Sequence, residues 1–413
     1  MKVFCGVDWS ERHHDIALVD EHGQLVDKRR ISDNLEGFTS LVDMLAAAGD
    51  SADAPIPVAI ETPRGLLVAA LRATGRRVYS INPMAVARYR ERYSVSRKKS
   101  DHVDAMVLAN ILRTDAHAHR ALPADSELVQ AVAVLARAHQ DATWRRTRAS
   151  NELRSLLREY FPGFLDAFAG RKGYLTSPDA RAVLAIAATP AEAAKLSRVR
   201  ITAALRRGGR QRGVDELAAE LYEALRRPQL RQLPMVEAAM GCQALALLAT
   251  LNVECASVDQ LTEATSEAFR RHPDHEIVTS FPGLADVTGA RVLAEIGDDR
   301  TRFADARALK AYAGSAPVTR ASGRSISVTH RKVKNDRLAA AGYLWSFVAA
   351  THAPPAKQHY QRRRDHGDRH PAALRNLFNR LLGCLHHCLV TGQRYDETAA
   401  FGSTAHQVRA SRA

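Results

Sequence analysis

The sequence predicts an α/β domain at the N-terminus, followed by a long α-helical region and a mainly α-helical C-terminal domain. Short apolar runs separated by turn residues continue as far as Pro83 and are typical of strands alternating with helices. Strand signals then stop, and two long stretches with helical periodicity follow at residues 128–160 and 236–269. We therefore place domains at residues 1–120, 121–270 and 271–398, with a disordered tail at residues 399–413.

The composition restricts the class of partner and the compartment. The net charge is +14, and arginine supplies most of the excess. Because arginine suits bidentate phosphate contacts, nucleic acid is favoured over an anionic membrane surface, and a solvated basic surface is the plain alternative. Five scattered cysteines disfavour a disulfide scaffold and favour a reducing cytoplasm. We expect no membrane-spanning segment and no signal peptide.

The element order of the first domain is three strands, helix, strand, helix, strand, helix. A three-stranded meander followed by two αβ units is the ribonuclease-H-like arrangement, in which strands one and four are neighbours. Asn34 is a candidate cap for the first helix. The expected strands are 3–8, 14–20, 23–31, 57–61 and 77–83, and the expected helices are 35–48, 66–73, a short one after Pro83, and one that opens at Ser100 and Asp101.

Four carboxylates occupy positions that this arrangement brings together. Asp8 ends the first strand and Glu61 ends the fourth, while Asp101 and Asp104 share one face at the start of the last helix. Carboxylates gathered at one point repel each other and stay ionised around hard cations. The sequence therefore predicts a site for a pair of Mg²⁺ ions, which would activate the attacking oxygen and stabilise the leaving oxygen of a phosphodiester.

Each of these acids also has an ordinary structural interpretation. Asp101 follows Ser100 and is a common residue type at a helix start. Glu61 precedes Thr62 and Pro63 and could be an exposed turn acid. The remaining polar residues of the first hairpin are expected at the surface or in its turn: Glu11, Asp15, Asp20, His13 and His14.

The middle region is predicted to be helical and basic. A long helix at 128–160 and a second at 236–269 are expected to pair antiparallel, as in a coiled coil or helical hairpin. Shorter helices are expected between them, with a basic hinge at 206–212. The region is either an arm that follows a nucleic-acid backbone or a spacer with solvated arginines. The shorter helices are expected at 179–188, 190–205 and 214–224.

The C-terminal domain contains a possible phosphate-binding turn and a candidate nucleophile. Residues 280–298 resemble a helix-hairpin-helix, whose glycine turn offers N–H groups to phosphate. Ser322 precedes Gly323 and lies between Arg320 and Arg324, so it could attack phosphorus while the guanidinium groups hold the phosphate. On spacing alone an ordinary turn is the stronger interpretation. The competing serines are Ser315, Ser325 and Ser327, and the candidate nucleic-acid-binding residues are Arg97, Lys98, Lys99, Arg320, Arg324, Arg331, Lys332 and Lys334.

Taken together, the motifs at both ends of the chain resemble the DEDD transposases of the insertion-sequence one-ten family. They occur in the family's order, which is more specific than any one motif, and the middle matches only as a helical insert. The motifs are Gly6-Val7-Asp8, Ile60 to Gly65, Lys99 to Ala105, Phe281-Pro282-Gly283, Leu293 to Asp298, Ala311 to Gly314, Ala316-Pro317, Ser322-Gly323, and the ending from His370 through Asn376 to Tyr395-Asp396.

This resemblance implies a RuvC-like first domain with Asp8, Glu61, Asp101 and Asp104 as metal ligands. It also implies that Ser322 attacks DNA and forms a covalent link, although Ala321 stands where a polar residue is common, which leaves neighbouring serines open. The implied partners are donor and target DNA and a structured non-coding guide RNA, the bridge RNA, which reads sequence by base pairing. A homo-oligomer is implied, dimer or tetramer, in which one subunit's RuvC-like domain completes another's serine site. The implied location is the bacterial cytoplasm, in association with the nucleoid.

Three other functions are compatible with parts of the pattern. A RuvC-like junction nuclease would use metal-activated water and would not need Ser322. A sugar kinase or actin-like ATPase also opens with a strand ending in Asp, but it needs a second Asp-x-Gly loop that we do not find here. A non-catalytic nucleic-acid-binding protein would tolerate loss of all four acids.

Overall fold

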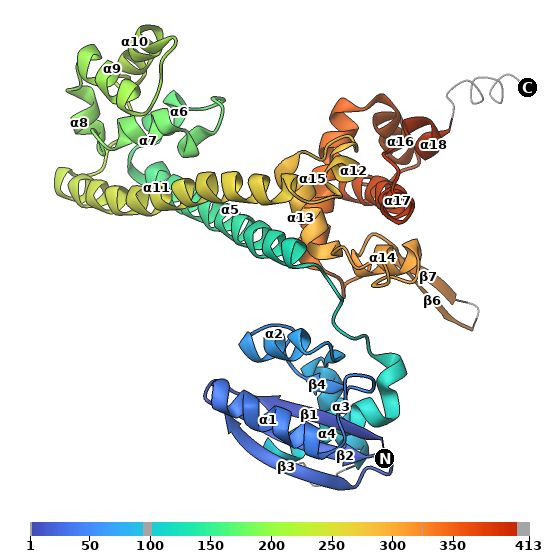
Figure 1. Ribbon diagram of the computed structural model, residues 1–413. Coiled ribbons are helices and arrows are strands. Elements are labelled where there is room, and N and C mark those ends of the chain that lie inside the picture. The colour runs from blue at the N-terminus through green and yellow to red at the C-terminus, as the bar shows by residue number, and fades with distance from the viewer. Residues whose placement is uncertain (1, 94–100, 324, 403–413) are drawn as a thin grey trace, which may run out of the picture. The chain divides into compact units, whose positions relative to one another are not determined.

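The computed structural model describes residues 2–93, 101–323 and 325–402, and the side chains of residues 92, 93, 101 and 102 lie outside this description. The chain forms two compact units, Met1–Ala124 and Asp125–Ala413. Figure 1 labels the elements of both. The first boundary expected from the sequence lies close to this division, whereas the expected boundary near residue 270 falls inside the second unit.

The first unit is built on a five-stranded mixed sheet with the order β3-β2-β1-β4-β5. β1 pairs antiparallel with β2 and parallel with β4, so strands one and four are neighbours as the sequence predicted. The strands are β1 (Val3–Trp9), β2 (His13–Asp20), β3 (Leu25–Ser32), β4 (Val58–Ile60) and β5 (Val78–Ser80), and the helices are α1 (Leu35–Ala47), α2 (Leu66–Ala73), α3 (Pro83–Tyr93), α4 (Asp101–Asp115) and the 3₁₀ turn η1 (Ala116–Ala118). This arrangement is compatible with a ribonuclease-H-like DEDD domain.

The two faces of the sheet carry different cores because side chains alternate along each strand. Val3, Cys5 and Val7 of β1 pack in one cluster with residues of α1 and α2. Phe4 of β1 packs in the other with residues of α3 and α4. The helices therefore cover the sheet on both faces, and the face that a β1 residue meets follows from its position along the strand.

A glycine allows β1 and α4 to approach closely. A Cβ atom at Gly6 would lie 2.0 Å from the carbonyl oxygen of Ala105 and 2.6 Å from the amide nitrogen of Ala109. These are backbone atoms in the interior of α4, so no side-chain rotation could make room. Gly6 thus brings α4 directly against the strand that ends near Asp8.

The second unit begins with two long helices, α5 (Glu127–Tyr160) and α11 (Pro234–Arg270), which lie side by side. They are antiparallel, because Arg145 contacts Glu254 while His139, earlier in α5, contacts Thr262, later in α11. This confirms the predicted helical pair, and the coiled-coil interpretation remains a prediction.

Short helices between α5 and α11 form their own core against both long helices. They are α6 (Pro162–Ala167), η2 (Tyr174–Thr176), α7 (Pro178–Leu184), α8 (Pro190–Ala194), α9 (Arg198–Arg207) and α10 (Val214–Ala224). The single helix expected at 190–205 is wrong. The chain breaks after α8, and the Ser197 side chain caps a new helix by accepting a hydrogen bond from the Arg200 N–H at 3.3 Å.

The C-terminal half packs on the same core as the start of α5. Val129, Val132 and Ala136 of α5 belong to one cluster with residues of α13, α15 and α17. The elements are α12 (His275–Thr279), α13 (Asp286–Ile296), α14 (Ala306–Tyr312), β6 (Val318–Ser322), β7 (Ser325–Thr329), α15 (Asp336–His352), α16 (Pro354–Asp365), α17 (His370–Thr391) and α18 (Glu397–Phe401).

One feature of this half was not expected from the sequence, and another starts later than expected. No strand was expected after Tyr312, where the chain forms the antiparallel hairpin β6–β7. The expected disordered tail at 399–413 starts too early, because α18 reaches Phe401 and buries Ala400 and Phe401 in the C-terminal core. Residues 403–413 lie outside the described residues.

The glycine turn between α12 and α13 packs against the protein. Gly283 has φ +86°, and a Cβ there would lie 2.9 Å from the amide nitrogen of Ala349 and the carbonyl oxygen of Trp345 in α15. Trp345 Nε1 also donates a hydrogen bond to the Pro282 oxygen at 3.0 Å. Packing therefore gives Gly283 a role of its own, and the helix-hairpin-helix interpretation remains a prediction.

Among the described residues, helix α11 is long and apolar enough to cross a membrane by length and composition alone. No such helix was expected from the sequence. The same test is passed by core helices of soluble proteins, and α11 packs against α5, α7 and α13.

Candidate functional site

A cavity of about 510 Å³ in the first unit, which we call the acid cavity, is lined by three of the four predicted acids. Asp8 comes from the end of β1, Glu61 follows β4 directly, and Asp104 lies in the first turn of α4. The other lining residues are Trp9, Ser10, His13, Asp15, Pro83, Ala87 and Arg90. Three elements that are distant in sequence thus deliver carboxylates to one cavity.

Strand alternation explains why these carboxylates meet. Phe4 and Ala59 belong to the core on the α4 face of the sheet. Asp8 and Glu61 lie an even number of residues further along their strands and therefore point to the same face. Since Gly6 lets α4 approach that face, the first turn of α4 places Asp104 in the same cavity as Asp8 and Glu61. Helix α4 packs across β1, β2 and β4.

Asp104 is almost fully buried, with 4% of its surface exposed, and it forms an ion pair with Arg90 of α3. The partnership offsets the high cost of burying a carboxylate. Arg90 Nε is buried and has no hydrogen-bond partner within the described part of the chain. Arg90 was not expected at the site, because its relation to Asp104 depends on how α3 packs against α4.

Asp15, expected at the surface, is 2% exposed and lines the same cavity. It lies directly across from Asp8 in the β1–β2 ladder, so both carboxylates share one face. Arg30 of β3 holds Asp15 through Nε and Nη2 at 3.1 and 2.8 Å. His14, expected in a polar turn, is also buried and lies 3.2 Å from Asp33 through Nε2. The hairpin register would have revealed the position of Asp15.

The lining fits a hard divalent cation in the chemistry of its donors. Carboxylate oxygens are the ligands that Mg²⁺ and Mn²⁺ prefer. Within the described residues, however, no group of three Asp, Glu, His or Cys side chains is assembled to hold a metal ion. Asp104 is paired with Arg90 instead. Asp101 begins α4 three residues before Asp104, and its side chain lies outside the described residues.

In the second unit, Ser322 is exposed at the end of β6. Cross-strand pairing places Ser322 opposite Ser325 and Arg320 opposite Ser327, so these four residues share one face. Ala321 and Ile326 lie on the other face, and Ile326 is 71% exposed. We call the segment Val318–Thr329 the serine hairpin.

Burial and strand pairing reduce the number of serines that could act as the nucleophile. Ser315 is 4% exposed and donates its hydroxyl to the Lys310 carbonyl at 3.2 Å, so it is not available to a substrate. Ser322, Ser325 and Ser327 remain on one accessible face.

The serine hairpin is held at its base by Glu295, Tyr312 and Asn335, which we call the hairpin clamp. Tyr312 ends α14 before the hairpin, and Asn335 caps α15 after it. The Asn335 backbone N–H donates to the Tyr312 carbonyl at 2.8 Å, and its Nδ2 donates to Tyr312 Oη and Glu295 Oε2, each at 2.7 Å. Arg137 fixes the buried Glu295 carboxylate through Nε and Nη2 at 2.7 and 3.1 Å. Both ends of the segment that carries Ser322 are thereby tied together.

Comparison with known proteins decides the family. Residues 5–162 match a DEDD-type model for IS110 elements described as Transposase, and residues 275–361 match one described as Transposase IS116/IS110/IS902 family. The chain is 59% identical over 401 residues to the mini-circle putative transposase for IS117 of Streptomyces coelicolor, covering 97% of each chain. The chain belongs to the IS110 family of transposases.

More distant relatives align over almost the whole transposase. It is 28% identical over 421 residues to the IS110 uncharacterized 43.6 kDa protein of Streptomyces coelicolor, with 97% of each chain covered. It is 29% identical over 392 residues to the IS900 uncharacterized 42 kDa protein of Mycobacterium paratuberculosis, covering 93% of this chain and 94% of the relative.

The basic residues predicted to bind nucleic acid in this transposase differ in their surroundings. Arg320 is exposed on the polar face of the serine hairpin, and Lys332 is also exposed. Lys334 forms an ion pair with Asp336 at 2.7 Å, and its stem covers Gly314. Arg331 is half-buried, and its Nε has no hydrogen-bond partner within the described residues. Arg97, Lys98, Lys99 and Arg324 lie outside the described residues.

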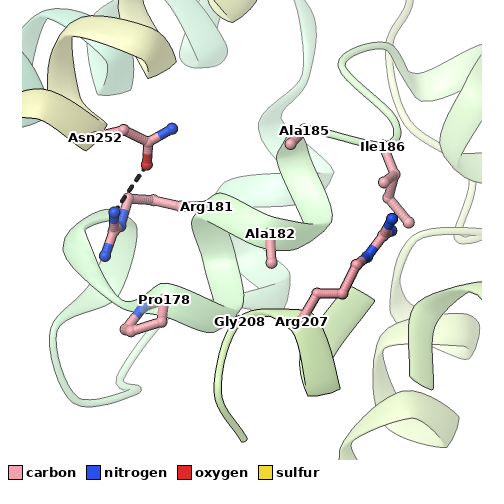
Figure 2. Close-up of a pocket in the computed structure, with 8 residues that line it drawn as sticks. All are labelled: Pro178, Arg181, Ala182, Ala185, Ile186, Arg207, Gly208 and Asn252. Carbon is pink, nitrogen blue, oxygen red and sulfur yellow. Dashed lines mark hydrogen bonds between the residues drawn. The ribbon is translucent and has the colours of Figure 1, made fainter. Parts of the chain in front are cut away.

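A second cavity of the transposase, of about 560 Å³, lies among α7, α9 and α11. Figure 2 shows Arg181 reaching Asn252, with an Nη1–Oδ1 distance of 2.8 Å, while the Arg207 side chain lies beside Ile186. Its lining contains no carboxylate among Pro178, Arg181, Ala182, Ala185, Ile186, Arg207, Gly208 and Asn252. This cavity therefore lacks the carboxylates that would hold a cation.

Proposed function

We propose that this transposase cuts and rejoins DNA with two chemical centres, a carboxylate site for divalent cations and a serine nucleophile. The observation that carries the proposal is that Asp8, Glu61 and Asp104, from three different elements, line one cavity. Asp101, one helical turn before Asp104, is assigned as the fourth ligand. A bound pair of Mg²⁺ ions would stabilise charge on the attacking and leaving oxygens of the phosphodiester.

The residues of the first unit have separate tasks in this proposal. Asp8, Glu61 and Asp104 supply oxygen ligands, and the buried position of Asp104 keeps water from competing for its carboxylate. Arg90 and Arg30 balance the negative charge of Asp104 and Asp15, respectively, before a cation binds. The site can therefore gather several acids without destabilising the folded unit.

Ser322 is assigned as the nucleophile. Its Oγ forms a bond to phosphorus, the bond from phosphorus to a deoxyribose oxygen breaks, and that oxygen leaves with a proton while the serine proton passes to solvent. Attack on this phosphoserine link by a hydroxyl of another strand rejoins the DNA and restores the serine. Exposure on the polar face with Arg320 supports this role, because the guanidinium can hold the phosphate.

A structured guide RNA and a homo-oligomer, dimer or tetramer, complete the proposal. The net charge of +14 supports a large polyanionic partner beyond the cleaved DNA. Both parts are tested on protein purified from cells that carry the whole element. Nuclease treatment identifies the nucleic acid that co-purifies, and light scattering measures the mass of the protein assembly. An enriched RNA encoded by the element and a mass of two or more chains are expected; protein free of RNA, or a monomer, would contradict the corresponding part.

The central experiment incubates the transposase with element RNA, donor DNA, target DNA and Mg²⁺, and measures denaturant-resistant protein–DNA adducts. Wild-type protein is expected to form the adduct, and Ser322→Ala and Asp8→Asn are each expected to abolish it. Ser325→Ala and Ser327→Ala are matched controls on the same face and are expected to retain it. If Ser325→Ala or Ser327→Ala lost the adduct while Ser322→Ala retained it, the nucleophile would be reassigned to that serine.

A metal-dependent nuclease that uses activated water is the second candidate. The acid cavity supports it, because the carboxylates are gathered within the first unit without help from the serine hairpin. It predicts that Ser322→Ala still cuts DNA and that no sample contains an adduct. That result would overturn the serine mechanism while leaving the carboxylate site in place.

A further inference from the structure

Helix α15 is apolar on its exposed side as well as its buried side. Trp345 and Ala341 are buried in the C-terminal core, while Tyr343, Leu344 and Phe347 are 47, 41 and 48% exposed. A helix that is apolar all round is normally covered on every side. Within the described residues, α15 contacts α13, α16 and α17, and these leave its aromatic face open.

The open face belongs to a cluster of four rings, Tyr343, Phe347, Tyr360 and His370, which we call the aromatic platform. His370 lies edge-on to the other three, with centroid distances of 6.2, 6.4 and 5.8 Å and interplanar angles of 88, 84 and 78°. Tyr343 and Tyr360 hydroxyls contact its Nε2 and Nδ1 at 3.2 and 2.8 Å. These contacts hold the rings in place, and Tyr343 and Phe347 keep about half of their surface exposed.

The charge around the platform is positive. Residues 352–376 contain six Lys or Arg and two Asp or Glu. Asp368 is already paired with Arg363, and Asp365 accepts a hydrogen bond from Gln361 at 2.8 Å. Arg369, which precedes His370, is exposed. A partner that fits must therefore offer flat apolar groups together with negative charge.

We propose that the aromatic platform binds an unpaired strand of DNA, with bases stacking on Tyr343 and Phe347 and the backbone near Arg369. Unpaired bases offer flat faces beside phosphates, whereas in a duplex those faces are hidden by neighbouring pairs. DNA is the substrate of a transposase, and cutting and rejoining its strands produces unpaired segments. This surface is distinct from the carboxylates and Ser322, so the proposal does not depend on their assigned roles.

The test measures binding of the full-length protein to fluorescein-labelled oligothymidylate by anisotropy across a salt series. Tyr343→Ala and Phe347→Ala are each expected to weaken binding about tenfold, because a stacked ring is lost. Phe347→Trp is expected to retain binding, which would exclude a merely structural defect. Leu344→Ala is the matched control on the same exposed face, and it is expected to leave affinity unchanged.

Two further arms separate the platform from other surfaces. Blunt duplex DNA is expected to bind the wild type and the alanine variants equally, and Arg369→Ala is expected to reduce the salt dependence for the single strand by about one unit of slope. Equal affinity of wild type and Tyr343→Ala/Phe347→Ala for oligothymidylate would overturn the proposal. The proposal would also be overturned if Tyr343→Ala and Phe347→Ala bound single-stranded DNA normally but lost binding to single-stranded RNA or lost self-association.

Discussion

The acid cavity and the serine hairpin place functional groups in opposite surroundings. Asp8, Glu61 and Asp104 are gathered by a sheet covered with helices on both faces. Ser322 stands on a two-stranded ribbon whose residues are almost all exposed. The difference has a physical reason: converging carboxylates need a rigid frame with counter-charges, whereas a serine that must meet a large substrate needs access. Accordingly, packing controls the first region and the clamp at its base controls the second.

The largest expected effect comes from the close approach of β1 and α4. Gly6→Ala places a Cβ 2.0 Å from the Ala105 oxygen, so α4 must move and carry Asp104 away from Asp8. We expect a loss of more than about 3 kcal/mol in unfolding free energy, together with loss of the thermal stabilisation that the proposed cation site predicts for Mg²⁺.

Gly37→Ala is the matched control for this change. A Cβ at Gly37 would meet the Ser32 oxygen at the same 2.0 Å, but at the β3–α1 connection rather than beside the acids. Denaturant unfolding with and without Mg²⁺ compares the two. If Gly37→Ala lost the Mg²⁺ response as fully as Gly6→Ala, the response would report general damage and not the carboxylate site.

Removing the counter-charge of the acid cavity should have the next largest effect. Arg90→Gln leaves Asp104 buried without its ion pair, which should destabilise the protein by about 3 kcal/mol without divalent cations. Mg²⁺ should restore more stability in this variant than in wild type, because a bound cation replaces the lost charge. Calorimetry with and without Mg²⁺ measures this. An unchanged or smaller Mg²⁺ response would contradict a cation site beside Asp104.

Acid should destabilise the unit that carries the serine hairpin through His139 of α5. Burial, followed by the nearby charge of Arg291, lowers the pKa of His139 from 6.5 to about 4. Between pH 6.5 and 4, His139 is protonated in the unfolded chain but not in the folded chain. The free energy of unfolding therefore falls as the pH drops from 6.5 towards 4. His139→Gln should remove about 3 kcal/mol of this dependence. Urea unfolding at several pH values tests it, with the exposed His22→Gln as control.

The smallest effect on stability should come from the hairpin clamp. Asn335→Ser keeps an oxygen that can cap α15 but removes the amide that donates to Tyr312 and Glu295. We expect a loss of about 1 kcal/mol and about a tenfold lower yield of the Ser322 adduct, with unchanged DNA affinity. An adduct yield equal to wild type would show that the clamp does not position the hairpin.

Several elements that depend on local sequence patterns were predicted correctly, whereas several features that depend on packing were not. Helix α2 begins and ends where the sequence predicted, and Asn34 caps α1, accepting a hydrogen bond from the Gly37 N–H at 2.8 Å. Apolar spacing and capping residues act within a few positions, so both can be read directly. The hairpin β6–β7 could not be read in this way, because its two strands are almost fully exposed and belong to none of the buried core clusters.

By itself, the sequence determined the strand order of the first unit, the two long helices, and the acids at Asp8, Glu61 and Asp104, since strand ends and helix starts are local features. Only the tertiary structure decided that Asp15 belongs to the acid cavity and that Arg90 neutralises Asp104. It also decided that Glu295 and Asn335 close the base of the serine hairpin. Such partnerships join residues far apart in the chain, and register and packing, which no local pattern contains, bring them into contact.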